Sequence, residues 1–262
     1  MQIGEPKAGL VTGNGRPSSV AQGHTGDAAS VSAQLARGTF LERLSEGERE
    51  SLLQTGIVRR FPRGAALMLQ DDRDDRVFVL LAGRVKIARV EGDGRELILD
   101  IRDPGDLLGE LAFIDAGPRV ATVTTLEAAQ ALVAPAQAMR GFMETTPRVA
   151  VVLLEIVAQR LRESNAARSH FGAADTMGRL AARILELADR YGEPCAEGIQ
   201  VASPLSQEEL TAWTGASRAA VAAALRALRD LGWVETERKK LIVLDAEALR
   251  ARAAQAADAV QN

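Results

Sequence analysis

The sequence GELAFIDAGPRVATV, residues 109–123, is the stretch from which the rest of the chain can be interpreted. Gly109 allows a ligand to approach the backbone closely, Glu110 follows it directly, and Arg119 stands nine residues after Glu110. A carboxylate accepts hydrogen bonds from hydroxyl groups, and a guanidinium forks onto a phosphate. The pattern therefore predicts a site for a ribose closed on its own phosphate, with a loop between the two charged residues.

The composition is typical of a soluble globular protein. The chain has 262 residues, enough for one large or two ordinary domains, and is 47% hydrophobic and 26% charged. No apolar run reaches the roughly 18 residues of a membrane span, and the N-terminus lacks the features of a secretory signal. The net charge of −3 means that any nucleic-acid surface must be local. We expect no membrane partner.

The chain contains few residues that could ligate a metal or attack a substrate. Cys195 is the single cysteine, and His24 and His170 are the two histidines. A single cysteine cannot form an internal disulfide, which fits a cytoplasmic location. It also cannot hold an iron–sulfur cluster within one chain. A zinc site is equally unexpected. No Ser/His/Asp or Cys/His set is found, so we expect a protein that is not an enzyme.

Short apolar runs separated by turn residues fill the first half of the chain. They cover residues 58–61, 66–69, 77–81, 85–90, 97–101, 120–126 and 129–133. Strands of this length and spacing predict an antiparallel barrel or jelly roll. The sequence Glu91-Gly92-Asp93-Gly94 predicts a hairpin turn. A short helical segment with a start signal at Ser45 precedes the strands.

A helical stripe of apolar residues begins after Pro147 and continues to about residue 175. This helix is longer than a small barrel needs to cover one opening. We therefore expect its spare apolar face to pack against a second subunit, although packing wholly on its own domain is the alternative. The segment from Asp175 to Gly178 is expected to form a joint, and a new helix is predicted over residues 180–191.

Two short helices joined by a tight turn are predicted near the C-terminus. Ser206 can cap the first helix and Gly215 ends it, while Ser217 caps a second helix over residues 218–230. Residues 233–244 then indicate a two-stranded wing with a basic tip. A small helical domain with a solvated arginine face is the alternative, but the wing and its basic tip favour DNA binding.

Barrel, long helix and winged helix-turn-helix in this order resemble the cyclic-AMP receptor protein/FNR family of bacterial transcription regulators. Residues 109–123 are similar to the phosphate-binding cassette of cyclic-nucleotide-binding domains, and SQEELTAWTGASRAAVAAALRALRDLGWVE, residues 206–235, is similar to the family's helix-turn-helix. The resemblance implies an α+β fold. Its expected parts are a disordered tail (1–34), a cyclic-nucleotide-binding jelly roll (35–146), a dimerisation helix and hinge (147–175), a winged helix-turn-helix domain (176–254) and a second tail (255–262).

The resemblance also implies a ligand and the residues that contact it. Glu110 would accept the ribose 2′-hydroxyl and Arg119 would pair with the cyclic phosphate, the alternative being a structural salt bridge between the two. Valine after the arginine lacks the hydroxyl that helps to hold guanine, which favours cyclic AMP as the allosteric ligand. The implied contacts are Gly109, Glu110, Leu111, Arg119 and Val120 from the cassette, with Ser164 and Asn165 from the long helices at the base.

For DNA, the resemblance implies contacts from both short helices and the wing: Ser206, Gln207, Ser217, Arg218, Ala219, Ala222, Arg226 and Lys239. The second helix departs from the family at its start, where Ser-Arg-Glu-Thr is replaced by Ser-Arg-Ala-Ala, and at Ala223, where a later arginine is usual. Arg218 can still bind guanine, but alanine offers only contact with a thymine methyl. We expect a different operator, or looser specificity with more weight on phosphate contacts.

The resulting hypothesis is a homodimeric transcription regulator that binds double-stranded DNA and has RNA polymerase as a further expected partner. Cyclic AMP between the barrel and the long helix would bias the dimer between two arrangements about the joint. One alternative keeps the DNA-binding role without cyclic AMP, either constitutively or in response to another ligand such as a cyclic dinucleotide. Another is an enzyme, for which the chain offers no catalytic set.

Overall fold

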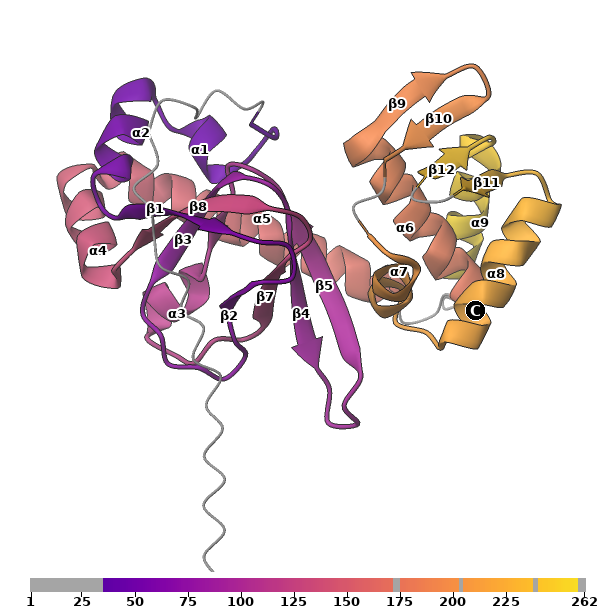
Figure 1. Cartoon of the computed structure of the whole chain (residues 1–262), viewed down its shortest axis with the longest axis horizontal. Helices are drawn as coiled ribbons and strands as arrows, with labels where there is room; N and C mark the ends of the chain where they lie inside the picture. The colour runs from indigo at the N-terminus through magenta and orange to yellow at the C-terminus, as the bar shows by residue number, and fades with distance from the viewer. Residues whose placement is uncertain (1–34, 172–174, 203–204, 238–239, 259–262) are drawn as a thin grey trace, which may run out of the picture.

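The computed structural model describes residues 35–171, 175–202, 205–237 and 240–258 (Figure 1). The predicted N-terminal tail, residues 259–262 and Lys239 lie outside these ranges. The described chain comprises a strand-rich part, a long helix that leads away from it, and a C-terminal part of helices and short strands. The predicted α+β fold class is confirmed.

The strand-rich part is a jelly roll of two four-stranded antiparallel sheets, with strand orders β1-β8-β3-β6 and β2-β7-β4-β5. Helices α1 (Phe40–Arg43) and α2 (Glu46–Leu53) precede it. Its strands are β1 (Ile57–Phe61), β2 (Ala66–Met68), β3 (Val77–Ala82), β4 (Val85–Val90), β5 (Glu96–Arg102), β6 (Leu107–Leu108), β7 (Thr122–Thr125) and β8 (Ala129–Ala134). The strands expected from the apolar runs are thus confirmed.

Local signals in the sequence explain several of these boundaries. Ser45 and Glu48 form a capping box at the start of α2, as the helix-start signal predicted. The predicted hairpin joins β4 to β5. A hydrogen bond from the Glu91 amide to the Arg95 carbonyl, at 2.9 Å, closes its turn. Strand β3 is buried almost throughout because one of its faces packs against the second sheet and the other is covered by helices. Its apolar residues therefore face the core on both sides.

Two helices of the strand-rich part were not predicted from the sequence. Helix α3 (Glu110–Asp115) occupies most of the segment expected to be a loop between Glu110 and Arg119, so that prediction was wrong for residues 110–115 and holds for residues 116–119. Gly109 enters α3 with φ +84°, and Ala116 leaves it with φ +56°, so left-handed residues bound a run of good helix formers. Helix α4 (Ala136–Thr145) follows β8 and packs beside the long helix.

The long helix α5 (Pro147–Phe171) is confirmed over almost its predicted length. One face packs on the jelly roll through Val149, Val152 and Leu153. The next helix, α6 (Thr176–Tyr191), begins four residues earlier than expected. Asp175 caps it by accepting a hydrogen bond from the Gly178 amide at 2.9 Å. The predicted joint from Asp175 to Gly178 is therefore wrong, because these residues form the cap and first turn of α6.

The C-terminal part contains the predicted helix-turn-helix and wing. Helices α7 (Gln207–Thr214) and α8 (Arg218–Asp230) are joined at Gly215, whose φ of +65° permits the tight turn. The wing strands belong to a sheet of order β11-β12-β10-β9. The remaining elements are β9 (Gly192–Cys195), β10 (Gly198–Val201), β11 (Val234–Glu237), β12 (Lys240–Val243) and α9 (Ala246–Asp258), which was not predicted.

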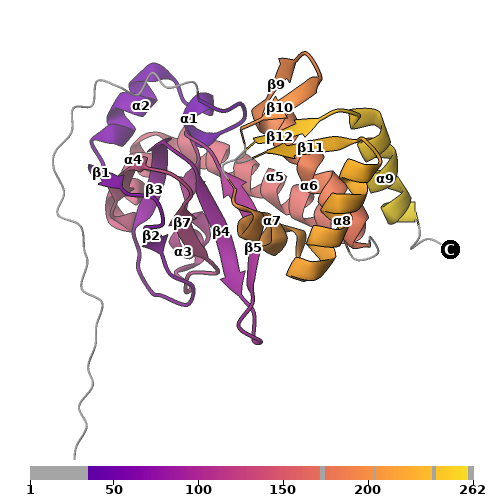
Figure 2. The ribbon, with the colours of Figure 1, turned by 45° about the vertical axis from the view of Figure 1, so that its right-hand side comes forward.

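The C-terminal part rests on the jelly roll of its own chain. Helix α7 lies against β5, and Figures 1 and 2 show α7 beside the β4–β5 hairpin from two directions. Ile98 and Ile101 of β5 share one hydrophobic cluster with α6, α7 and α8. Among the described residues, no helix is long and apolar enough to cross a membrane.

Candidate functional site

Arg119 is brought under Gly109 by the packing of the cassette. The Arg119 Nη1 group donates to the Gly109 carbonyl at 3.2 Å, and Nη2 donates to the Arg76 carbonyl. A Cβ atom on residue 109 would overlap the Arg119 guanidinium, and Met68 Sδ would lie 3.2 Å from that atom. Glycine is therefore needed at position 109 for both its φ and the close approach of the guanidinium.

The Arg119 guanidinium is poorly compensated for its burial. Only 3% of Arg119 is exposed, and its Nε has no hydrogen-bond partner in the part of the chain that the structure describes. The nearest carboxylate is Asp74, whose Oδ1 lies 4.0 Å from Nη2. Burial lowers the pKa of Arg119, and Asp74 only partly opposes that effect. A buried cation with a spare donor is suited to an anion with several acceptor oxygens.

Glu110 is held by the long helix. Arg160 of α5 places Nη1 2.6 Å from Glu110 Oε1 and Nη2 2.9 Å from Asp106 Oδ1. Arg160 Nη1 also donates to the Leu107 carbonyl at 3.1 Å. The expected alternative was a salt bridge between Glu110 and Arg119. In the structure each pairs with a different residue, Glu110 with Arg160 and Arg119 with Asp74.

Arg160 and Asp106 are site residues that the sequence interpretation missed. Arg160 stands one helical turn before Ser164, so it faces the same side of α5 as a residue that had been singled out. That spacing was the available signal. Asp106 lies in the turn between β5 and β6 and gave no comparable signal, because 54 residues separate it from Arg160.

The structure brings Gly109, Glu110 and Arg119 together, whereas the other predicted ligand residues lie around them on the surface. Leu111 and Val120 are exposed, at 40% and 53%. Ser164 and Asn165 are exposed on α5, beyond the turn that carries Arg160. The buried elements of the site thus come from the cassette and Arg160, and its outer rim is open.

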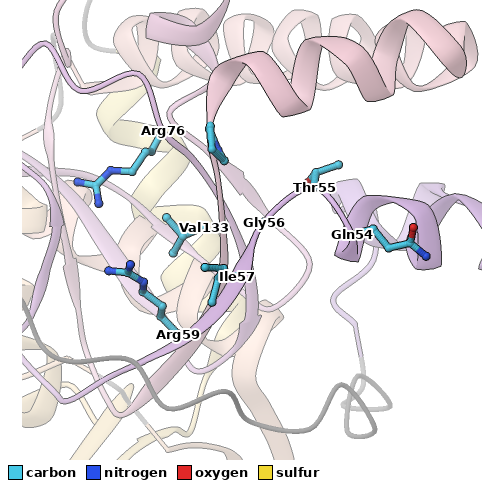
Figure 3. A pocket seen from close by; sticks show the side chains of 8 residues that line it. Gln54, Thr55, Gly56, Ile57, Arg59, Arg76 and Val133 are labelled. Atoms are coloured by element: carbon cyan, nitrogen blue, oxygen red, sulfur yellow. The ribbon is translucent and has the colours of Figure 1, made fainter.

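A separate hollow of about 330 Å³ lies at the start of β1 (Figure 3). It contains neither Glu110 nor Arg119. In Figure 3 the guanidinium groups of Arg59 and Arg76 extend to the same side. Its lining residues are Gln54, Thr55, Gly56, Ile57, Arg59, Arg76, Val133 and Pro135. We assign the cassette, and not this hollow, as the candidate ligand site, because only the cassette combines a buried cation with a carboxylate.

Two predicted DNA contacts have a structural role in the helix-turn-helix. The Ser206 hydroxyl accepts from the Glu209 amide at 3.2 Å, and the Ser217 hydroxyl accepts from the Ala220 amide at 3.2 Å. Both hydroxyls therefore cap helices, which stabilises each helix by about 1 kcal/mol. Gln207 is exposed in the first turn of α7.

The outer face of α8 combines exposed arginines with small residues. Arg218 and Arg226 are exposed, as is Ala219, while Ala222 is half-buried between them. Arg218 forms an ion pair with Glu208 at the start of α7, with both side chains largely exposed. The face is thus flat in its middle and positively charged at its edges. Such a surface can enter a major groove closely.

Within the described ranges, the structure contains no group of three or more His, Cys, Asp or Glu side chains arranged to hold a metal. Cys195 is a half-buried free cysteine on β9. The candidate site presents a buried guanidinium and a carboxylate, and α8 presents a face flanked by arginines.

Two protein-family descriptions match the chain in the order of its parts. Residues 58–146 match the cyclic nucleotide-binding domain, and residues 178–252 match the Crp-like helix-turn-helix domain. The first match covers the cassette and the second covers α7, α8 and the wing.

Similar whole proteins are also known. A CRP-like cAMP-activated global transcriptional regulator of Mycobacterium tuberculosis is 36% identical over 193 residues, which cover 74% of this chain and 86% of that protein. A solved CRP-family transcriptional regulator from Thermus thermophilus aligns with a TM-score of 0.65 and 25% identity, over 75% of this chain and 96% of that one. The c-di-GMP-responsive global regulator of Xanthomonas campestris shares the fold, with a TM-score of 0.68 and 22% identity over 76% of this chain and 99% of that one.

Proposed function

Because the chain belongs to the cyclic-AMP receptor protein/FNR family of DNA-binding transcription regulators, with a cyclic nucleotide-binding domain, we propose that it is a homodimeric regulator gated by cyclic AMP. The observation that carries the proposal is the buried Arg119 guanidinium, held beneath Gly109 with a spare Nε donor and next to Glu110. A cyclic nucleotide supplies what this site lacks, namely one negative charge with several acceptor oxygens and a ribose hydroxyl.

Each residue of the site then has a distinct role. Arg119 pairs with the cyclic phosphate, and the glycine at 109 leaves room for both to approach the backbone. Glu110 accepts the ribose hydroxyl while Arg160 holds the carboxylate in place from α5. Ser164 and Asn165 meet the base, and Leu111 and Val120 form the rim. Valine at position 120 offers no hydroxyl to guanine, which favours adenine.

Isothermal titration of the purified full-length chain tests the choice of ligand. We expect one cyclic AMP to bind per chain. Cyclic GMP should bind at least about tenfold more weakly, which is the loss expected for one or two hydrogen bonds. Cyclic di-GMP serves as the third titrant. A heat of binding with cyclic di-GMP alone would reject cyclic AMP as the ligand. No heat of binding with any of the three nucleotides up to millimolar concentration would show that the protein does not bind them.

The outer face of α5 supports the homodimer. Val151, Leu154 and Leu161 are 53%, 63% and 58% exposed, although each is a large apolar side chain. They recur at spacings of three and seven residues, which is the pattern of a two-helix seam. Asn165 continues this seam as a polar residue, the type of residue that fixes register between paired helices. A second copy of α5 is the occupant that this repeating face fits.

Leu161→Arg should convert the dimer into a monomer, because two arginines would meet across the seam. Sedimentation velocity at micromolar concentration measures this directly. Leu231→Arg is the matched control, because Leu231 is similarly exposed, at 54%, but lies outside α5. A Leu161→Arg protein that sediments like the wild type would place the subunit interface elsewhere.

DNA binding is assigned to the outer face of α8 together with the start of α7. Arg218 is positioned to contact a base edge, and Arg226 to contact phosphate further along the helix. Glu208 holds Arg218 in the absence of DNA, and an exposed pair of this kind is weak enough to be released. In a two-fold dimer the two α8 helices would meet half-sites about one helical turn apart.

A further inference from the structure

The turn between β5 and β6 contacts Arg160, the partner of Glu110, and also contacts α6 of the C-terminal part. Its sequence is Asp103-Pro104-Gly105-Asp106, and both aspartates are 8% exposed. Asp106 Oδ1 accepts from Arg160 at 2.9 Å, while its Oδ2 accepts from the Asp103 amide at 3.1 Å. Asp106 therefore joins the long helix to the first residue of the turn.

Asp103 continues the connection into α6. Its Oδ2 lies 2.5 Å from Arg190 Nη2, and the Tyr191 hydroxyl donates to its Oδ1 at 3.0 Å. Arg190 also donates to the Ile101 carbonyl at 2.9 Å, and the Arg84 guanidinium lies 4.8 Å from the Tyr191 ring centre. The last residues of α6 are thus anchored to the end of β5. Burial raises the pKa of Tyr191, so its hydroxyl remains a donor at neutral pH.

The backbone of the turn has little freedom to absorb a change. Gly105 adopts φ +101° and donates from its amide to the Leu80 carbonyl at 2.7 Å. Its carbonyl accepts from the Leu41 amide at 2.9 Å, and a Cβ atom at this position would overlap Thr39. The backbone of the turn is fixed to the barrel and to α1. If the Arg160–Asp106 ion pair weakens, we therefore expect the side-chain contacts of the turn to change and its backbone to stay in place.

Asp103 directly follows β5, the strand against which α7 packs. Lys86 of β4 lies 2.5 Å from Glu96 and 3.8 Å from Glu209 of α7, measured between Nζ and Oε1 atoms. Leu97 of β5 approaches Gly215 at the end of α7. These contacts fix α7, and therefore α8, relative to the barrel. In a dimer, that position also sets the separation of the two α8 helices.

We propose that the polar chain Glu110–Arg160–Asp106–Asp103–Arg190 couples the occupancy of the cassette to the docking of α7 on β5. The proposal rests on the function proposed above, because it takes a cyclic nucleotide as the occupant. Arg160 divides its guanidinium between Glu110 and Asp106. An anion at the cassette offers Arg160 a further acceptor and weakens its hold on Asp106. Asp103 and Asp106 are positioning residues in this scheme and do not touch the ligand.

Hydrogen exchange and calorimetry on the full-length chain test the coupling together. Asp103→Asn and Tyr191→Phe each weaken the anchor, so amide exchange in α7 and β5 should become faster in the ligand-free protein. Reciprocity requires the same variants to bind cyclic AMP more tightly, by about fivefold. Glu110→Gln, measured without ligand, should instead slow exchange in α7, because Arg160 then loses an acceptor that competes with Asp106 and binds Asp106 more firmly. Asp93→Asn, an exposed carboxylate at the β4–β5 turn, is the control for charge and should leave both measurements unchanged.

The possible failures separate the two proposals. If calorimetry shows no cyclic AMP binding to the wild type, the ligand assignment fails, while exchange in Glu110→Gln still reports the coupling. If Asp103→Asn and Tyr191→Phe speed exchange in α7 but leave the cyclic AMP affinity unchanged, the anchor is only structural and the coupling is rejected. Unchanged exchange of α7 in Glu110→Gln would reject it as well. Because Tyr191→Phe removes one oxygen atom, it remains informative where Asp103→Asn fails to fold.

Discussion

Arg119→Gln is expected to weaken cyclic AMP binding at least about 100-fold, or about 2.7 kcal/mol, while leaving the unfolding temperature unchanged or higher. The loss of affinity follows from removing the cation that faces the phosphate. The stability is preserved because the buried guanidinium is poorly compensated: burial lowers its pKa, Nε is unpartnered among the described residues, and Asp74 is 4.0 Å away. The glutamine amide can keep one of the two hydrogen bonds to backbone carbonyls.

Calorimetric titration with cyclic AMP and thermal unfolding by circular dichroism measure the two effects separately. Arg59→Gln is the matched control, because Arg59 is half-buried on β1 beside the hollow of Figure 3 and outside the cassette. It should bind cyclic AMP like the wild type. An Arg119→Gln protein that is strongly destabilised would show that Arg119 is mainly structural, and one that binds cyclic AMP normally would place the phosphate elsewhere.

Arg218→Ala is expected to weaken binding to a preferred duplex by about 10- to 100-fold, the value of one good arginine–guanine contact, without changing cyclic AMP affinity. A duplex selected by the protein from a random pool and labelled with fluorescein provides the probe, read by anisotropy. Glu208→Gln is the matched control: it removes the partner of Arg218 and one negative charge near the phosphates. Its affinity should equal or exceed that of the wild type.

The same assay separates base reading from phosphate contact. Arg218→Ala should reduce the preference for the selected duplex over a scrambled one, whereas Arg226→Ala should weaken both equally and lower the salt slope by about 1. Equal losses on both duplexes in Arg218→Ala would assign Arg218 to the phosphate backbone. Sequence reading would then fall to the alanine face and to DNA shape.

The elements that could be predicted from the sequence are those with strong local signals. The apolar runs gave the longer strands of the jelly roll, and Ser206, Gly215 and Ser217 gave the helix-turn-helix through its caps and turn. Strand β6 was missed because it has only two residues. The start of α6 was misplaced because a cap at Asp175 with Gly178 in the first turn resembles a flexible joint.

The long-range contacts of the site could not be predicted in the same way. Glu110 and Arg119 were recognised from their own spacing, but their partners come from distant segments. Arg160 lies 50 residues from Glu110, and the carbonyl of Arg76 lies 43 residues from Arg119. A single sequence shows the type of a charged residue, whereas its partner is decided by how the barrel and α5 pack. The contacts of Asp103 with Arg190 and Tyr191 could not be predicted for the same reason.

If a cyclic nucleotide in the cassette controls DNA binding, its addition must change the affinity of the protein for DNA. The most direct measurement is the anisotropy titration of the selected duplex with the wild-type protein, with and without saturating cyclic AMP, beside the same titration of Arg119→Gln. We predict that cyclic AMP changes the affinity of the wild type for DNA at least about tenfold, within the usual range of allosteric coupling, and leaves Arg119→Gln unchanged. Equal DNA affinity with and without cyclic AMP in the wild type would contradict control of DNA binding by the cassette.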